Sequence, residues 1–112
     1  MSSAERRKGS QFERDVVAFL RANGHPYAER AYGAGRPDDR GDVDGIPGWT
    51  LELKNCQRLD LAGWCSEASS EAANARRPRW SVIFKRRNRP TADAYVLLDL
   101  ATFAELLSEE TP

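Results

Sequence analysis

The sequence predicts an α/β domain in which a mixed central sheet is flanked by helices, and three observations lead to this prediction. The chain has 112 residues, which is the length of a single domain. Hydrophobic residues make up 40% and charged residues 30%, as in an ordinary globular protein. Segments of helical and strand periodicity follow one another in the order helix, three strands, helix, two strands, helix. We expect one domain over residues 1–112, with residues 1–8 flexible.

The first helix is expected over residues 10–23. Ser10 and Glu13 have the spacing of a capping box, and apolar residues then recur at helical spacing from Phe12 to Leu20. Asn23-Gly24, followed closely by a proline, is a typical helix stop.

Three strands are expected next, over residues 27–32, 42–46 and 49–55. A glycine-rich polar loop, residues 33–41, separates the first two. Pro47-Gly48 is a turn, and the sequence WTLELKN after it alternates strictly between apolar and polar side chains. The second and third strands should therefore form a hairpin.

The second half of the chain predicts a helix over residues 60–75, with mostly small residues along its apolar stripe. Strands are expected over residues 80–86 and 95–98. A final short helix is expected over residues 100–107, with Asp99 as its cap.

The charge is balanced overall but distributed unevenly. Residues 76–91 carry seven Lys or Arg and no Asp or Glu, although the net charge of the chain is zero. Such a segment is either a solvated rim or a site for a polyanion such as nucleic acid. Two cysteines without a CxxC spacing indicate free thiols in a reducing cytoplasm, and a single histidine argues against zinc. No apolar run reaches the length of a membrane span, so we expect no membrane partner.

Glu13 is unusual because it falls within the apolar arc of the first predicted helix. A carboxylate on a core-facing arc needs a reason. One reason is the capping box with Ser10. The other is a carboxylate directed at a metal ion or a water molecule at the edge of the sheet.

Asp42, Glu52 and Lys54 form the second unusual group. The strand period places Glu52 and Lys54 on one face, and the hairpin brings Asp42 beside Glu52, although Asp44 points the same way and competes for that role. Two converging carboxylates repel each other, and a divalent cation removes the repulsion. Ligands that are all oxygen suit Mg²⁺ or Mn²⁺. The alternatives are a turn residue at Asp42 and a solvated ion pair on the strand.

The order of a glutamate on the first helix, an aspartate on the second strand and ExK on the third resembles the PD-(D/E)XK nuclease superfamily. KGSQFERDVVAFLRANG resembles the first helix of archaeal-type Holliday-junction resolvases. RAYGAGRPDDRGDVDGIPGWTLELKN is similar to resolvase-like nucleases of actinobacterial phages, and the likeness continues through VIFKRR to YVLLDLATFAELL. Gly41-Asp42 replaces the family's Pro-Asp. The resemblance implies a restriction-endonuclease-like fold.

The resemblance also implies roles for individual residues. Asp42 and Glu52 would bind Mg²⁺, for which Mn²⁺ should substitute, with the backbone carbonyl of Leu53 as a third ligand. Glu13 would lie near the same ion, through a water molecule. Lys54 would position the attacking water or stabilise charge on the scissile phosphate. The implied activity is a structure-selective DNA endonuclease, a Holliday-junction resolvase serving recombination or repair, that hydrolyses phosphodiesters with metal-activated water.

Basic residues near the loop and in the basic segment are candidates for contacts with DNA phosphates. They are Arg30, Arg36, Arg40, Arg76, Arg77, Arg79, Lys85, Arg86, Arg87 and Arg89. A four-way junction has twofold-related cleavage points, so we expect a homodimer, with the last helix and Trp64 as candidate surfaces. The alternatives are a flap, single-strand or exonucleolytic DNase of the same fold, and a DNA-binding module without turnover.

Overall fold

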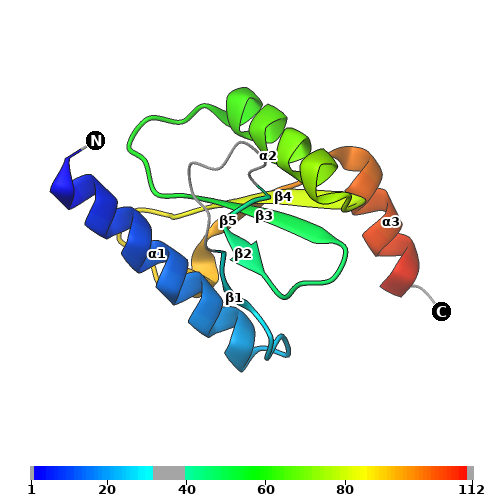
Figure 1. The fold of residues 1–112 in the computed structure, drawn as a ribbon, viewed down its shortest axis with the longest axis horizontal. Helices are drawn as coiled ribbons and strands as arrows, with labels where there is room; N and C mark the ends of the chain where they lie inside the picture. The colour runs from blue at the N-terminus through cyan, green and yellow to red at the C-terminus, as the bar shows by residue number, and fades with distance from the viewer. Residues whose placement is uncertain (1, 32–39, 111–112) are drawn as a thin grey trace.

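The computed structural model describes residues 2–31 and 40–110 and confirms the expected order of elements. The chain forms a mixed α/β domain, shown as a ribbon in Figure 1. Its elements are α1 (Ser3–Ala22), β1 (Glu29–Arg30), β2 (Val43–Asp44), β3 (Trp49–Lys54), α2 (Leu61–Ala75), β4 (Arg79–Phe84), the 3-10 turn η1 (Thr91–Asp93), β5 (Tyr95–Leu97) and α3 (Leu100–Glu110).

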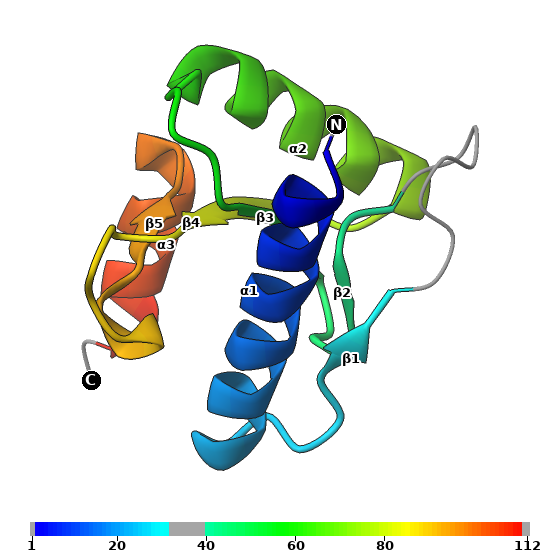
Figure 2. The same ribbon diagram turned by 90° about the vertical axis from the view of Figure 1, so that its left-hand side faces the viewer.

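The five strands form one sheet in their chain order, β1-β2-β3-β4-β5. Neighbouring strands are antiparallel except for β3 and β4, which run parallel. Parallel neighbours need a crossover connection, and α2 supplies it. The two longest strands therefore lie at the centre of the sheet, with helices on both sides of them (Figures 1 and 2).

Strict alternation along β3 divides its side chains between the two faces of the sheet. Leu51 and Leu53 pack with Phe12 and Val16 of α1 in one buried cluster. Glu52 lies on the opposite face, toward α2, together with Thr50 and Lys54. The face that the sequence predicts to be polar is thus covered by a helix.

The second buried cluster lies between α2 and the sheet. Trp64, only 6% exposed, packs here with Ala68 and Val82, and its ring lies 5.5 Å from that of Phe84. Trp64 is therefore a core residue. The prediction that it contributes to a dimer surface is wrong, because a side chain inside the domain has no area left for a partner.

Helix α1 begins at Ser3, seven residues before the predicted start. Ser2 caps it, and its side chain accepts a hydrogen bond of 3.1 Å from the backbone N–H of Glu5. Ser2 and Glu5 have the same capping spacing as Ser10 and Glu13. Ser10 lies inside the helix, so the capping-box explanation for Glu13 is wrong. The residues expected to precede the helix form its first turns.

The turn between β2 and β3 fixes the register of the hairpin. Gly45 has a φ of +87°, and a Cβ there would overlap the backbone carbonyl of Tyr27. Only glycine tolerates both conditions. The turn pairs Val43 with Leu51, and this register brings Asp42, the residue before Val43, next to Glu52.

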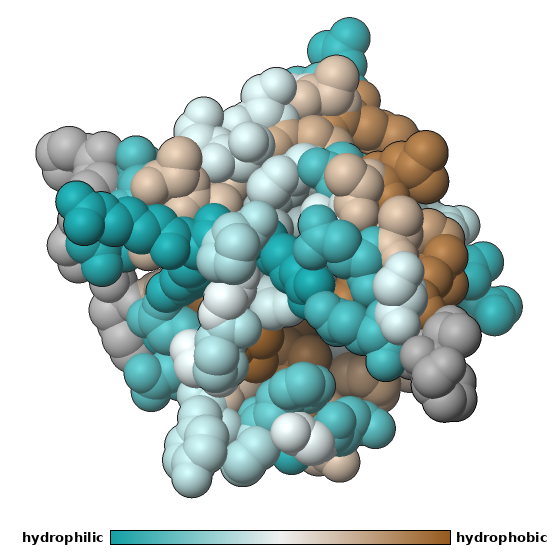
Figure 3. Space-filling view, turned by 90° about the vertical axis from the view of Figure 1, so that its right-hand side faces the viewer, coloured by the Kyte–Doolittle hydropathy of each residue, from teal (hydrophilic) through white to brown (hydrophobic). Residues whose placement is uncertain are grey.

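Helix α3 is capped as predicted, since the Asp99 carboxylate accepts a hydrogen bond of 2.8 Å from the N–H of Thr102. The C-terminal half of α3 is anchored to the sheet by Arg79 at the start of β4, which forms ion pairs with Glu105 and Glu109. The described structure leaves an apolar stripe on α3 exposed. Leu100 is 79%, Phe103 47% and Leu107 52% exposed. Figure 3 views the side on which α3 lies and shows apolar side chains at that surface.

Candidate metal centre

Asp42 extends the pairing between β2 and β3 past the end of β2. Its backbone N–H donates to the carbonyl of Leu51, and its side chain accepts a hydrogen bond of 2.8 Å from the N–H of Leu53. Glu52 lies between these two partners in the chain, and its negative charge raises the pKa of the Asp42 carboxyl group. Asp44 instead accepts a hydrogen bond of 3.4 Å from Arg77. Of the two candidate aspartates, Asp42 is the one beside Glu52.

Burial and neighbouring carboxylates raise the pKa values of both carboxyl groups. Burial raises the pKa of Asp42 to about 8, and the negative charge of Glu52 adds to the effect. Burial also raises the pKa of Glu52 to about 9, together with its contact to Glu71 and the charge of Glu67. Without a cation, protons compensate these two groups at neutral pH.

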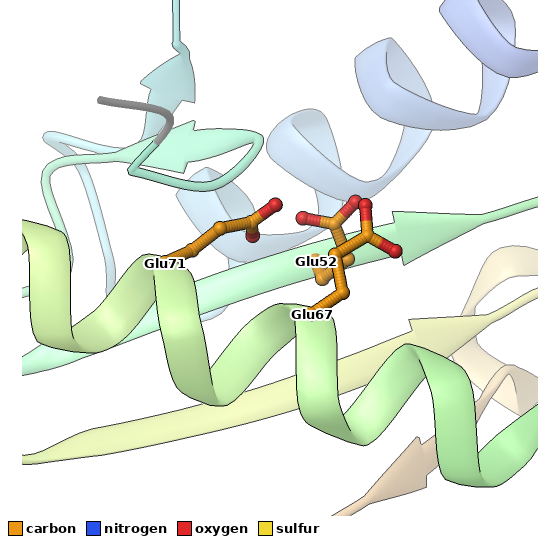
Figure 4. A group of neighbouring side chains, drawn as sticks. All are labelled: Glu52, Glu67 and Glu71. Atoms are coloured by element: carbon orange, nitrogen blue, oxygen red, sulfur yellow. The ribbon is translucent and has the colours of Figure 1, made fainter. Parts of the chain in front are cut away.

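Two glutamates of α2, Glu67 and Glu71, join Glu52 above β3. One carboxylate oxygen from each of the three lies within 4.8 Å of the others, and the three side chains converge in Figure 4. Glu52 is 5% exposed. Its Oε2 atom is buried and has no hydrogen-bond partner among the described residues. A buried carboxylate oxygen in that condition needs either a proton or a cation to compensate its charge.

Lys54 is the cation that lies nearest to this group. Its Nζ is 3.0 Å from Glu67 Oε2 and 3.4 Å from Glu52 Oε1. Burial acts to lower the pKa of Lys54, but the hydrogen bond to Glu67 and the charge of Glu52 outweigh it, so the pKa is raised. Lys54 therefore stays protonated at neutral pH and serves as a positive charge, not as a base.

Glu13 approaches the same carboxylates from α1. Its charge contributes to the raised pKa of Asp42, and its Oε1 lies 2.9 Å from Arg30. The structure thus places Asp42, just before β2, together with Glu52 and Lys54 of β3, while Glu13 of α1 acts on Asp42 through its charge and does not belong to the cluster of three glutamates. Arg30 pairs with Glu13, and Lys54 pairs with Glu52.

The donor set fits a hard divalent cation. The side chains of Glu52, Glu67 and Glu71 offer only oxygen, which suits Mg²⁺ or Mn²⁺, and Asp42 lies next to Glu52 without belonging to this group. The Leu53 carbonyl is a further candidate. In an antiparallel strand the N–H and C=O of one residue point the same way, and the Leu53 N–H points at Asp42.

The sequence did not single out Glu67 and Glu71. Glu71 is buried, on the same side of α2 as Ala68 and Ala72. An acidic residue on a stripe of small apolar residues is a signal of the same kind as Glu13.

The predicted DNA-contacting residues fall into three groups. Arg30, Arg77 and Arg79 are held by carboxylates of the protein itself. The second group comprises Arg76, Arg40 and Arg36. Arg76 ends α2 in a left-handed conformation. Arg40 is exposed at the start of the segment before β2, and Arg36 lies outside the described residues. The third group lies together on one groove and comprises Lys85, Arg86, Arg87 and Arg89.

Comparison with protein-family models, curated proteins and solved structures finds no match to this chain. None of the helices that the structure describes has an apolar stretch long enough to reach across a bilayer.

Proposed function

We propose that this protein is a Mg²⁺-dependent DNA endonuclease with the PD-(D/E)XK fold, acting on branched DNA such as four-way junctions. One observation carries the proposal. Asp42 and Glu52, ten residues apart in sequence, place their carboxyl groups next to each other, Asp42 half-buried and Glu52 buried, with Lys54 on the same face of β3 as Glu52. Bringing like charges together away from water costs free energy, and a cation bound between them would offset that cost.

Each residue has a task in phosphodiester hydrolysis. Asp42 and Glu52 would hold the ion, with the Leu53 carbonyl beside them. A bound divalent ion supplies positive charge at the phosphate and lowers the pKa of water. Lys54 adds a second positive charge where negative charge develops on the phosphate. Glu13, paired with Arg30, orients water at the edge of this group.

A junction has two cleavage points related by a twofold axis, so the proposal includes a homodimer. The exposed stripe of Leu100, Phe103 and Leu107 on α3 is the surface we assign to the second copy. An apolar stripe of this kind gains free energy when a second copy covers it.

The experiment that tests the proposal is a cleavage assay with Mg²⁺ on a synthetic four-way junction, beside flap, duplex and single-stranded DNA. Asp42→Asn and Glu52→Gln should each lose at least a hundredfold in rate and still bind junction DNA. Asp44→Asn is the matched control, because Asp44 faces Arg77, and it should cleave like the wild type.

Other outcomes separate the alternatives. Cleavage of flap or single-stranded DNA alone would assign the fold to a different nuclease substrate. Binding without cleavage by the wild-type protein would indicate a DNA-binding module. Cleavage that survives Asp42→Asn and Glu52→Gln would place the active site elsewhere.

A further inference from the structure

A groove of about 740 Å³ lies at the carboxyl ends of β3 and β4. Its walls are one side of α1 between Lys8 and Asp15, residues 55–57 and 59 after β3, and the end of β4 with the residues after it, 84–89, together with Tyr95 of β5. Figure 2 looks at this side of the molecule. Asn55 in the groove directly follows Lys54 in the chain, and the carboxylates of the site are not among the residues that line the groove.

The groove is strongly basic. Five Lys or Arg side chains line it, against Asp15 as the single acidic one. Arg89 is paired with Asp93 at 3.1 Å. Among the described residues, no carboxylate lies within ion-pair distance of Lys8, Lys85 or Arg87. These charges are available to a polyanion.

An aromatic stack forms one wall of the groove. The rings of Phe84 and Tyr95 lie 5.0 Å apart, and the Arg86 guanidinium lies 4.9 Å from the centre of the Tyr95 ring. Tyr95 is 49% exposed. Nucleic-acid bases stack on tyrosine rings and on arginine planes.

Side-chain amides complete the lining. Gln57 and Asn88 each carry a hydrogen-bond donor and an acceptor, whereas the amides of Gln11 and Asn55 already form hydrogen bonds within the protein. Amides of this kind bind the edges of bases, and the pairing edges are accessible only when a base is unpaired.

We propose that this groove binds unpaired nucleotides of a DNA single strand. Its volume falls in the range of roughly 300–1,000 Å³ typical of small-ligand pockets, which suits one or two nucleotides. Positive charge, aromatic surface and amides together are what single-strand sites combine. The choice of DNA rests on the proposed nuclease function, and the inference narrows its substrate to branched DNA with unpaired nucleotides at the branch.

The test is fluorescence anisotropy of the full chain with a labelled 12-nucleotide oligo-dT and a duplex of equal length. EDTA is present throughout, so binding is measured without cleavage. We expect the single strand to bind at least fivefold more tightly than the duplex. The double variant Lys85→Glu/Arg87→Glu, at two exposed positions, should weaken single-strand binding at least tenfold. Tyr95→Ala should weaken it about tenfold, the effect of one stacked base.

Arg6→Glu is the matched control, since Arg6 is exposed on the part of α1 that does not line the groove. It should change the affinity less than twofold. Circular dichroism spectra establish that each variant is folded. Equal or tighter binding of the duplex, or a double variant that behaves like Arg6→Glu, overturns the inference. Neither result affects the cleavage test with Asp42→Asn. The binding role of the groove and the nuclease function are therefore tested independently.

Discussion

Replacing Glu52 with glutamine should stabilise the metal-free protein while removing its response to Mg²⁺. Burial and the neighbouring glutamates raise the pKa of Glu52 from 4.5 to about 9. At pH 7 the folded protein therefore keeps a proton on this group that the unfolded chain has released. Folding must take up that proton against its ordinary affinity, and glutamine, which has nearly the same shape, has no such requirement.

The magnitude follows from the difference between pH 7 and the ordinary pKa, 4.5. About 2.5 pKa units at roughly 1.4 kcal/mol each give about 3 kcal/mol in favour of the variant. For a domain of this size, that difference raises Tm by on the order of 10 °C. Because the folded pKa is raised, the stability from this group is fully present below pH 4.5 and is lost as the pH rises through about 9. The gap between variant and wild type should therefore widen from pH 5 to pH 9 and close near pH 4.

Thermal unfolding in EDTA, followed by circular dichroism at several pH values, measures this gap. Glu29→Gln, an exposed carboxylate on β1, is the matched control and should leave Tm unchanged within about 1 °C. If Glu52→Gln proves no more stable than the wild type at pH 8, the Glu52 carboxyl group is not destabilised by burial. The argument for a cation at this site would then lose its basis.

Two further predictions concern the ion and the dimer. Mg²⁺ or Mn²⁺ should raise the Tm of the wild type, and the rise should be larger at pH 8 than at pH 5, since protons compete for Asp42 and Glu52 below their pKa values of about 8 and 9. Scanning fluorimetry measures this, and an equal rise in Asp42→Asn would contradict it. Leu107→Glu should convert the dimer to a monomer in light scattering by placing a charge in the apolar interface, whereas Ala101→Glu, the control, should not. A wild type that is monomeric at 100 μM would refute the assignment of α3 to the second copy.

Local sequence patterns predicted most of the fold because they report local physics. The alternation in WTLELK marks β3, the Asp60 and Asp99 side chains cap their helices, and Gly48 ends the predicted turn. The start of α1 was wrong because two capping signals of the same spacing compete, and propensity alone does not choose between them.

The sequence also predicted that Glu13, Asp42, Glu52 and Lys54 gather at one place. The hairpin register brings Asp42 to Glu52, and a short turn sets that register. The sequence left open the choice between Asp42 and Asp44. In the structure Asp42 is the one beside Glu52, because Arg77 from the end of α2 contacts Asp44.

The roles of the basic residues and of α2 depended on packing between segments far apart in the chain. Arg79 reads as part of a basic run, but it lies against Glu105 and Glu109 of α3. Glu71 was not singled out from the sequence, but α2 packs over β3 and buries the Glu71 side chain beside Glu52. Periodicity determines which side of an element is apolar. Which charges meet is determined by the crossover of α2 and the docking of α3, since electrostatic partners depend on distance in space and not on distance along the chain.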